Sequence, residues 1–278
     1  MEPLIKIEHV RKVYRMGDEK VLALDDVSLD IYKGEIVCFL GTSGSGKSTF
    51  LNMVAGLEKP TRGHIFIGGI PIHKLNEAQV TLFRQKNIGF IFQAYHLMPM
   101  LTALENVSLP LAFRGVPKRR RNALAKQALK AVGLVGYDNR KPSQMSGGQQ
   151  QRVGIARALA GVPKIIFADE PTGNLDTNTT KEVMNLIVNQ VRKHNQTLIL
   201  VTHDRSIADY ADKVVTIQDG NIIGVENRQG LSIAEAEKIA EAATNEIHRA
   251  KKAAKAENSE GDLEEEVLEE VEGKVEDD

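Results

Sequence analysis

The stretch GTSGSGKST at residues 41–49 constrains the fold of this 278-residue chain more than any other segment. It fits the pattern G-x-x-x-x-G-K-[ST], with Gly41, Gly46, Lys47 and Ser48 at the fixed positions. The apolar run GEIVCFL precedes it and the helical pattern STFLNMVAGL follows, which predicts a buried strand, a loop and a helix. Main-chain N–H groups of such a loop converge on nucleotide phosphates, while the lysine meets the β and γ phosphates and the serine hydroxyl ligates magnesium. We therefore predict a nucleotide site, and reject the alternative of a plain glycine-rich turn.

Short apolar runs alternate with helical patterns along much of the chain. The runs NIGFIFQ, KIIFADE, TLILVTHD and KVVTIQDG are typical of buried strands, and QQRVGIARALAG and NTTKEVMNLIVNQVRKH are typical of helices. This alternation predicts a mostly parallel sheet in an α/β domain. Near the N-terminus, LIKIEHVRKVYR and VLALDDVSLDIY alternate apolar and polar residues, and HIFIGGIPI resembles a hairpin, so we expect an antiparallel subdomain. Residues 94–160 are mostly helical in pattern and are predicted to form an inserted helical lobe.

Charge divides the chain into two parts. Residues 226–278 contain 17 acidic and 7 basic side chains, a net charge of −10, whereas the whole chain carries only −1. We predict a folded domain at 1–225 and an acidic extension at 226–278. The extension begins with a weakly amphipathic helical pattern, and beyond Ala256 its composition predicts disorder. It is either a solubilising appendage or a docking or autoinhibitory element.

Cysteine content and hydropathy limit where the protein works. The single cysteine, Cys38, excludes an intramolecular disulfide framework and fits a reducing compartment. No apolar run approaches the length of a membrane span, and the N-terminal segment lacks the apolar core of a signal peptide. We expect a protein that does not cross a membrane by itself.

Polar residues follow three of the predicted strands. Asp169 and Glu170 come directly after KIIFA, His203 follows LILVT, and Gln93 follows FIF. At the carboxyl ends of parallel strands these side chains face the crevice where α/β sheets bind ligands. Asp169 is suited to holding magnesium, Glu170 to accepting the proton of an attacking water, and His203 to contacting the γ-phosphate. Gln93 is predicted to complete the magnesium shell through its carbonyl, although taken alone it is equally consistent with an ordinary loop residue.

The stretch QMSGGQQQRVGIARAL at residues 144–159 is an unusual helix start. Ser146 occupies the position of an N-terminal cap, and Gly147 and Gly148 follow it although glycine is unfavourable in a helix. Two bare glycines at this position indicate that another group approaches the backbone closely, yet no lysine stands beside them.

These motifs together resemble the ATP-binding cassette (ABC) ATPases over residues 3–225. The phosphate loop, Gln93, MSGGQ at 145–149, ADEP at 168–171, GNLD at 173–176 and His203 occur in the order found in that family. The resemblance implies a RecA-like sheet, an antiparallel subdomain and a helical subdomain, with ATP and Mg²⁺ as ligands. The whole phosphate loop is implied to bind ATP: Gly41, Thr42, Ser43, Gly44, Ser45, Gly46, Lys47, Ser48 and Thr49.

The resemblance also implies that two cassettes pair head to tail. Ser146, Gly147, Gly148 and Gln149 of one copy then close over the γ-phosphate held by the other, and Asp176 lies at the dimer seam. This pairing accounts for a helix start without its own lysine. Met145 departs from the usual leucine and is expected to pack inward.

Tyr14 occupies the place where the family has an aromatic residue under the adenine ring; its other interpretation is a half-buried strand tyrosine. More narrowly, the chain resembles the macrolide-export, lipoprotein-release and cell-division cassettes, which work with separate membrane subunits. Residues 94–101 are then expected to help line the groove for that subunit, unless they belong to the core of the helical lobe. The resemblance thus implies a peripheral ATPase on the cytoplasmic face of the membrane.

Two other functions compete with this interpretation. A soluble cassette ATPase acting on DNA or ribosomes is the first, but the coiled coil or second cassette of such proteins is missing from the sequence. KRRR at 118–121 begins a helical pattern and is interpreted as a solvated face, so we expect no nucleic-acid partner. A non-hydrolysing structural clamp is the second, and the presence of Glu170 and His203 argues against it.

Overall fold

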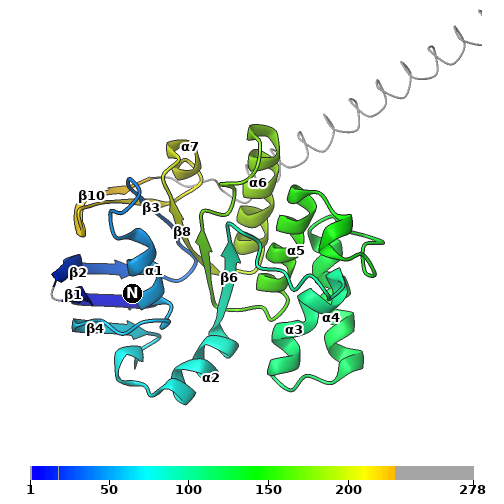
Figure 1. Ribbon diagram of the computed structural model, residues 1–278, viewed down its shortest axis with the longest axis horizontal. Helices are drawn as coiled ribbons and strands as arrows, with labels where there is room; N and C mark the ends of the chain where they lie inside the picture. The colour runs from blue at the N-terminus through cyan, green and yellow to red at the C-terminus, as the bar shows by residue number, and fades with distance from the viewer. Residues whose placement is uncertain (1, 18, 229–278) are drawn as a thin grey trace, which may run out of the picture. The chain divides into compact units, whose positions relative to one another are not determined.

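The computed structural model describes residues 2–17 and 19–228 (Figure 1). The predicted helix and disordered tail fall almost entirely on residues 229–278, which lie outside the described residues. The proposed division of the chain at residue 225 therefore stays a prediction.

A six-stranded sheet forms the centre of the described part, with the strand order β10-β9-β3-β8-β7-β6. The five strands from β9 to β6 in this order run parallel to one another. The sixth strand, β10, lies at the edge and pairs antiparallel with β9. The mostly parallel α/β sheet predicted from the sequence is confirmed, whereas β10 had no predicted counterpart. The strands are β3 (Ile36–Leu40), β6 (Ile88–Phe92), β7 (Ile165–Asp169), β8 (Thr197–Thr202), β9 (Lys213–Gln218) and β10 (Asn221–Asn227).

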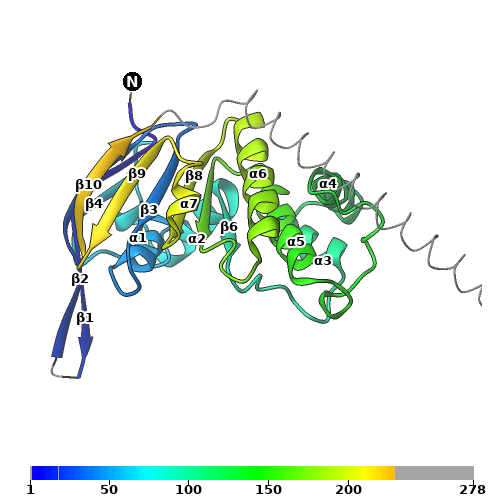
Figure 2. The ribbon, with the colours of Figure 1, turned by 90° about the horizontal axis from the view of Figure 1, so that it is seen from above.

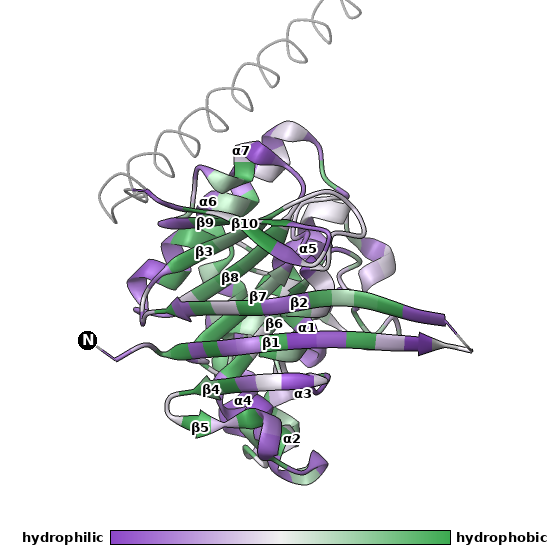
Figure 3. Cartoon of the chain, turned by 90° about the vertical axis from the view of Figure 1, so that its left-hand side faces the viewer, coloured by the Kyte–Doolittle hydropathy of each residue, from purple (hydrophilic) through white to green (hydrophobic). Residues whose placement is uncertain are grey.

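A second sheet is antiparallel, as the sequence predicted, and has the strand order β2-β1-β4-β5. Along β1 and β2 apolar and polar residues alternate, because one face of the sheet is buried and the other is exposed (Figure 3). The strands are β1 (Ile5–Met16), β2 (Glu19–Ile31), β4 (Arg62–Ile67) and β5 (Ile70–Pro71).

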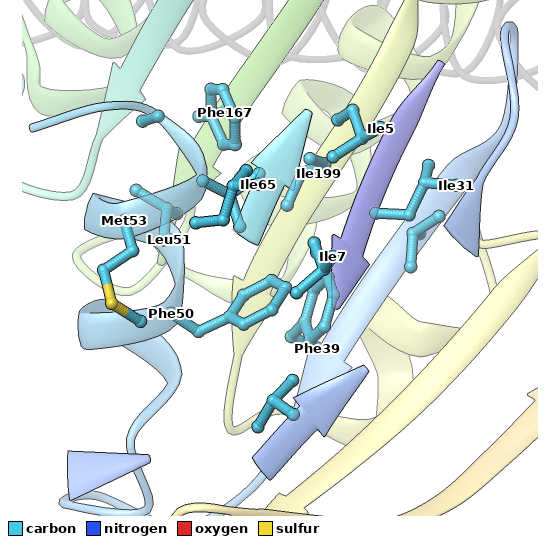
Figure 4. Packing of buried hydrophobic residues seen from close by; sticks show 14 of the residues in the cluster. Ile5, Ile7, Ile31, Phe39, Phe50, Leu51, Met53, Ile65, Phe167 and Ile199 are labelled. Carbon is cyan, nitrogen blue, oxygen red and sulfur yellow. The ribbon is translucent and has the colours of Figure 1, made fainter. Parts of the chain in front are cut away.

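The main core joins the two sheets through helix α1 (Lys47–Val54). Phe50 of α1 packs on Phe39 of β3 with ring centroids 4.3 Å apart, and Ile7 and Ile65 of the antiparallel sheet lie in the same cluster (Figure 4). Burying these large side chains contributes roughly 1.5–3 kcal/mol each to folding. The phosphate loop therefore leads into a helix that is fixed from both sides.

Helices α3, α4 and α5 form the lobe on the right of Figure 1, whereas α2 contacts β6 and α7 contacts β3. Helix α5 packs against α3, α4 and α6. No helix among the described residues is long and apolar enough to cross a membrane. The helices are α2 (Glu77–Asn87), α3 (Ala103–Phe113), α4 (Lys118–Ala131), α5 (Gly147–Leu159), α6 (Thr177–Lys193) and α7 (Arg205–Ala208), with short 3₁₀ turns at Ile72–Lys74 and Pro142–Gln144.

Candidate functional site

The phosphate loop runs from the end of β3 to the start of α1, and close backbone contacts require glycine at Gly41 and Gly46. Gly46 has a φ of +104°, and a Cβ placed there would lie 2.5 Å from the carbonyl oxygen of Ala23. A Cβ on Gly41 would lie 2.3 Å from the carbonyl oxygen of Ile217. No side chain caps α1 and no acidic residue lies in its first turn, so the positive end of the helix remains available to an anion.

The other loop residues are arranged around that helix start. Thr42, Ser43 and Gly44 are exposed at the tip of the loop, Ser45 is buried, and Ser48 lies exposed in the first turn of α1. These positions place hydroxyl groups and main-chain N–H groups on the surface of the loop.

Lys47 lies against its own loop. Its Nζ donates to the carbonyl oxygens of Gly41 and Thr42 at 2.8 and 2.6 Å. Burial lowers the pKa of Lys47, while the nearby carboxylates of Glu170 and Asp169 act to raise it. The lysine charge is thus held between the loop and the two carboxylates, where a phosphate group would arrive.

The carboxyl ends of three strands bring the predicted polar residues to one edge of the sheet. Asp169, the last residue of β7, is in register with Phe92 of β6 and Val201 of β8. Gln93 and His203 follow directly after β6 and β8. The topology therefore places these side chains beside the phosphate loop, as expected for ligand crevices of α/β sheets.

Asp169 has the properties of a cation ligand. Its Oδ1 is buried and has no hydrogen-bond partner among the described residues. Burial and the charge of Glu170 raise the pKa of the Asp169 carboxyl, while Lys47 and a hydrogen bond with Ser48 act against that shift. A buried carboxylate oxygen together with a serine hydroxyl is the kind of hard oxygen donor set that Mg²⁺ prefers. The residues present therefore fit a magnesium ion.

Glu170 is held firmly beside His203. Its Oε1 lies 2.8 Å from His203 Nδ1, and its Oε2 accepts a hydrogen bond from the Thr202 hydroxyl at 3.3 Å. The Glu170 side chain is 19 % exposed and that of His203 66 %. The backbone of Glu170 is left-handed, with φ of +46°, and its N–H donates to Val201 O at 2.9 Å. A partly exposed carboxylate with a fixed orientation can accept a proton from water.

Thr202 also belongs to this site, although no sequence motif singled it out. Its hydroxyl also accepts a hydrogen bond from the N–H of Asp204 at 3.0 Å, so it links the glutamate to the turn that carries the histidine. A threonine directly before a strand-end histidine was the available signal.

Gln93 is positioned by Asn174, another residue that the sequence analysis did not single out. The Asn174 side chain donates to the main-chain oxygen of Gln93 at 3.0 Å, and Gln93 Nε2 lies 3.4 Å from Asn174 Oδ1. A Cβ on Gly173 would lie 2.6 Å from the Gln93 amide. Gln93 thus lies at the predicted edge but bonds to the 173–174 turn, and its role as a magnesium ligand stays a prediction.

Tyr14 lies on β1 next to the phosphate-loop helix. Its hydroxyl donates to Glu58 Oε2 at 2.6 Å, and the nearby Thr49 side chain acts to lower the pKa of that hydroxyl. Burial raises the pKa of the Tyr14 hydroxyl, and the bond to Glu58 raises it further. The structure therefore brings Tyr14 to the loop, although its contact with adenine stays a prediction.

Ser146 caps α5 through a reciprocal pair of hydrogen bonds. The Gln149 N–H donates to Ser146 Oγ at 3.4 Å, and the Ser146 N–H donates to Gln149 Oε1 at 3.1 Å. Gln149 also donates to the Tyr137 hydroxyl at 3.1 Å. Met145 is 8 % exposed, which confirms that its side chain packs inward.

The two glycines of this helix start lie close to side chains of the same chain. A Cβ on Gly147 would lie 2.9 Å from the Tyr95 hydroxyl, and one on Gly148 would lie 2.9 Å from the Thr179 methyl group. The close approach inferred from the sequence thus has an intramolecular component that the sequence analysis did not foresee.

Asp176 lies beside this helix start. The two line one surface hollow, together with Arg152 and Glu182. Asp176 caps α6, because one of its oxygens accepts from the N–H groups of Asn178 and Thr179, both at 3.0 Å. Hydrogen bonds from Thr179 lower the pKa of Asp176. Its carboxylate is therefore ionised and bound locally.

The phosphate loop and the α5 start belong to different parts of the molecule. Helix α1 packs against β2, β7 and β8, whereas α5 packs against the other lobe helices and β6. In both ribbon views α1 lies near the antiparallel sheet and α5 near α3 and α4 (Figure 1, Figure 2). The structure brings Lys47, Ser48, Asp169, Glu170 and His203 together, and it leaves Ser146–Gln149 with Asp176.

A strand, phosphate loop and helix with two strand-end carboxylates define a P-loop nucleotide-binding domain. The ABC transporter family matches residues 24–173. An uncharacterised ABC transporter ATP-binding protein of Thermotoga maritima is 45% identical over 228 residues, which cover 82% of this chain and 97% of that protein. The chain belongs to the ABC transporter family and is an ATP-binding cassette with ATPase activity.

Solved structures and a longer relative extend the comparison. The cassette MJ0796, in a dimeric post-hydrolysis state bound to ADP and Pi, matches with a TM-score of 0.76 and 42% identity, covering 82% of this chain and all of that chain. The macrolide export ATP-binding/permease protein MacB of Vibrio parahaemolyticus is 44% identical over 220 residues, but these cover only 34% of its length and 79% of this chain. The cassette fold predicted from the sequence is confirmed.

Proposed function

We propose that this cassette hydrolyses ATP with magnesium in a homodimer that encloses two ATP molecules, and that it drives a separate membrane subunit. The driven process is export, extraction of lipids or lipoproteins, or transmission of force across the membrane. The observation that carries this proposal is the separation of Lys47 from the Ser146–Gly148 helix start within one chain. A second copy supplies the missing half of each site.

The phosphate loop holds the triphosphate in this proposal. The N–H groups of residues 41–49 and the ammonium of Lys47 contact the phosphate oxygens. Ser48, Asp169 and Gln93 hold Mg²⁺, and the unpartnered Oδ1 of Asp169 supports this assignment. When bound, magnesium neutralises negative charge on the phosphates.

Glu170 acts as the general base. It accepts the proton of the attacking water, while His203 orients the carboxylate and contacts the γ-phosphate. The 2.8 Å contact between the two side chains and the second bond from Thr202 support this arrangement. Holding a base in one orientation lowers the cost of aligning it with water and substrate.

The second copy offers Ser146, Gly147, Gly148 and Gln149 to the γ-phosphate, and Asp176 lies at the seam. The start of a helix carries partial positive charge and main-chain N–H groups, so it binds a phosphate without a lysine. Support comes from two solved structures of the cassette MJ0796. Both are dimers, and one of the two structures contains ADP and Pi.

A surface hollow between β6 and the helical lobe indicates which kind of segment of the membrane subunit would bind there. Its walls include the apolar residues Phe90, Phe92 and Pro163 and the cations Arg84, Arg114 and Arg157. Within residues 2–17 and 19–228 none of these arginines forms an ion pair, since their hydrogen bonds go to carbonyl or hydroxyl oxygens. An amphipathic cytoplasmic segment with acidic side chains complements this surface.

Residues 94–101 border this hollow without lining it. Met98 and Met100 are 51 % and 77 % exposed, so these two methionines do not form the core of the lobe. Arg157 connects the loop to the hollow, because it donates to the carbonyl oxygens of Tyr95 and His96. Exposed methionines beside an apolar hollow extend the surface available to a partner.

Charge reversal in the hollow tests the membrane partner. Arg114→Glu should release the cassette from native membranes, whereas Arg120→Glu, an exposed arginine on α4 outside the hollow, should leave it bound. Liposomes made from the extracted lipids should retain neither protein. Retention by protein-free liposomes, or cosedimentation with ribosomes or DNA instead of membranes, would contradict the peripheral cytoplasmic location proposed here.

A further inference from the structure

We propose that Glu58 is a positioning residue that fixes the ring of Tyr14 for the base of ATP, and that Lys12 closes the opposite face of that ring. The inference rests on the proposed contact between Tyr14 and adenine. It adds two residues, outside the nucleotide motifs, that determine how well a nucleotide with a base binds.

The Glu58 carboxylate receives donors from three directions. Its Oε2 accepts from the Tyr14 hydroxyl at 2.6 Å and lies 3.0 Å from Lys12 Nζ. Its Oε1 accepts from Asn52 Nδ2 at 3.1 Å. Burial acts to raise the pKa of Glu58, but the bonds from Tyr14, Lys12 and Asn52 lower it overall, so the carboxylate is ionised at neutral pH. Charge-assisted bonds of this kind restrict the rotation of the tyrosine.

Lys12 lies over the ring that Glu58 holds. Its Nζ is 4.9 Å from the centroid of the Tyr14 ring and donates to the carbonyl oxygen of Lys59 at 2.9 Å. The Lys12 side chain is only 14 % exposed, so the ammonium is fixed on that face. A base can therefore stack only on the other face, and the cation–π contact helps to hold the ring flat against it.

The same cluster connects the ring to the phosphate loop. Asn52, which donates to Glu58, belongs to α1, whose first residue is Lys47, and Thr49 of that helix lies close enough to lower the pKa of the Tyr14 hydroxyl. Glu58 follows the end of the helix. The tyrosine is therefore fixed relative to the element that starts at the phosphates, which sets the distance between the base and the triphosphate.

A purely structural role for Glu58, joining β1 to α1, predicts a different result from the positioning role. Loss of a structural link should weaken every ligand of the loop, because α1 itself would shift. Loss of positioning should weaken only ligands that carry a base. Inorganic tripolyphosphate has the phosphates without the base, so it separates the two.

Steady-state hydrolysis and tripolyphosphate titration provide the test in the full chain. Tyr14→Ala should raise the KM for ATP roughly 10-fold, in line with the loss of one stacked base. Glu58→Ala should raise it about threefold to fivefold, comparable to an exposed cation–π contact. The kcat should stay within about twofold, and the affinity for tripolyphosphate should not change. Glu8→Ala is the matched control, because Glu8 lies on β1, the strand that carries Tyr14, and pairs with Lys6 at the surface.

A double-mutant cycle shows whether Glu58 acts through the tyrosine hydroxyl. Tyr14→Phe keeps the ring but removes the bond to Glu58, so Glu58→Ala should have a smaller effect in that background. Full additivity would overturn the positioning role. Lys12→Met, which removes the ammonium without removing the carboxylate, should reproduce part of the effect and serves if Glu58→Ala does not fold.

The outcomes also separate the two proposals. If Tyr14→Ala leaves the KM for ATP unchanged, Tyr14 does not contact the base and both ideas are wrong. If Tyr14→Ala raises the KM while Glu58→Ala and Lys12→Met do not, only the positioning inference is wrong. If Glu58→Ala weakens tripolyphosphate as much as ATP, its role is structural.

Discussion

The edge of the large sheet and the start of α5 are both predicted to contact phosphate, but they are built in different ways. At the sheet edge, three separate segments of the chain supply Lys47, the adjacent pair Asp169 and Glu170, and His203, and the parallel strands bring them together. At the start of α5, the groups are contiguous in sequence and are fixed by local caps. The first region depends on the fold, and the second depends on a short motif.

This difference indicates which region carries the chemistry. The sheet edge holds an oriented carboxylate, a buried unpartnered oxygen and a buried lysine. In the hollow at the α5 start, Asp176 is bound to its own helix cap and Arg152 pairs with Glu182 at 2.7 Å. The α5 start therefore offers main-chain N–H groups and a serine hydroxyl but no available acid or base. In the proposed dimer, these groups complete a site whose lysine and carboxylates belong to the other copy.

The largest effect should come from Glu170→Gln. Removing the base should lower hydrolysis by roughly 10²–10⁴-fold while ATP still binds, because the phosphate loop is untouched. The variant should then accumulate as a dimer with ATP. Light scattering at saturating ATP measures this directly, and a strictly monomeric variant would mean that the shared site is wrong.

Substitutions in the two regions should be inactive for different reasons. Ser146→Arg places a bulky side chain where the facing γ-phosphate would lie, so hydrolysis should stop while a single copy still binds ATP. Lys47→Ala removes a direct phosphate contact and should weaken binding itself. Mixed together, the two variants should regain activity, because one of the two sites in the heterodimer has both intact parts. Absence of recovery at every mixing ratio would count heavily against a site made from two copies.

The same contrast explains how much could be predicted from the sequence. The phosphate loop and the α5 start are contiguous motifs, and their local structure followed the pattern. Helix α3 escaped a specific prediction because Pro110 interrupts its pattern, although Thr102 and Glu105 form a capping box that could have marked its start. Contacts between distant segments, such as Thr202 with Glu170, depend on strand order, which no local pattern encodes.

A smaller effect is expected on stability, because the Asp169 carboxyl at the sheet edge is buried. Burial raises the pKa of Asp169, so the folded state retains this proton to a higher pH than the unfolded chain does. The free energy of unfolding should therefore decrease as the pH rises above the usual aspartate range. Asp169→Asn removes the buried charge and should raise the melting temperature by about 2 °C at neutral pH without magnesium, while abolishing magnesium-dependent hydrolysis.

Thermal melts at pH 5 and pH 7.5 check this expectation. The advantage of Asp169→Asn should be larger at the higher pH, where the wild-type carboxylate is ionised. Asp209→Asn is the control, because Asp209 is an exposed carboxylate paired with Arg228, whose guanidinium stays charged at both pH values. A variant less stable than the wild type at both pH values would show that the carboxylate is stabilising in the folded state.

The smallest effect on ATP binding and hydrolysis should come from removing the acidic end of the chain. The position of the truncation matters, because the first residues after 225 form hydrogen bonds with the folded domain. Residues 226 and 227 follow the predicted division at residue 225 and still belong to β10, where Glu226 and Asn227 pair with Val214 and Lys213 of β9. Arg228 donates its N–H to the carbonyl oxygen of Asp212 at 2.7 Å. A cut after residue 225 would remove these bonds and destabilise the strand beside β3.

Truncation after Arg228 avoids that loss. Neither region compared above contains a residue beyond 228, so ATP affinity and magnesium-dependent hydrolysis should stay within about threefold of the full chain. The truncation after residue 225 serves as the comparison and should melt at a lower temperature, because it loses ladder hydrogen bonds worth about 1 kcal/mol each. A protein cut after Arg228 that is folded by circular dichroism but fails to bind ATP would mean that the acidic segment takes part in the nucleotide site. A severalfold rise in hydrolysis would instead favour the autoinhibitory interpretation of that segment.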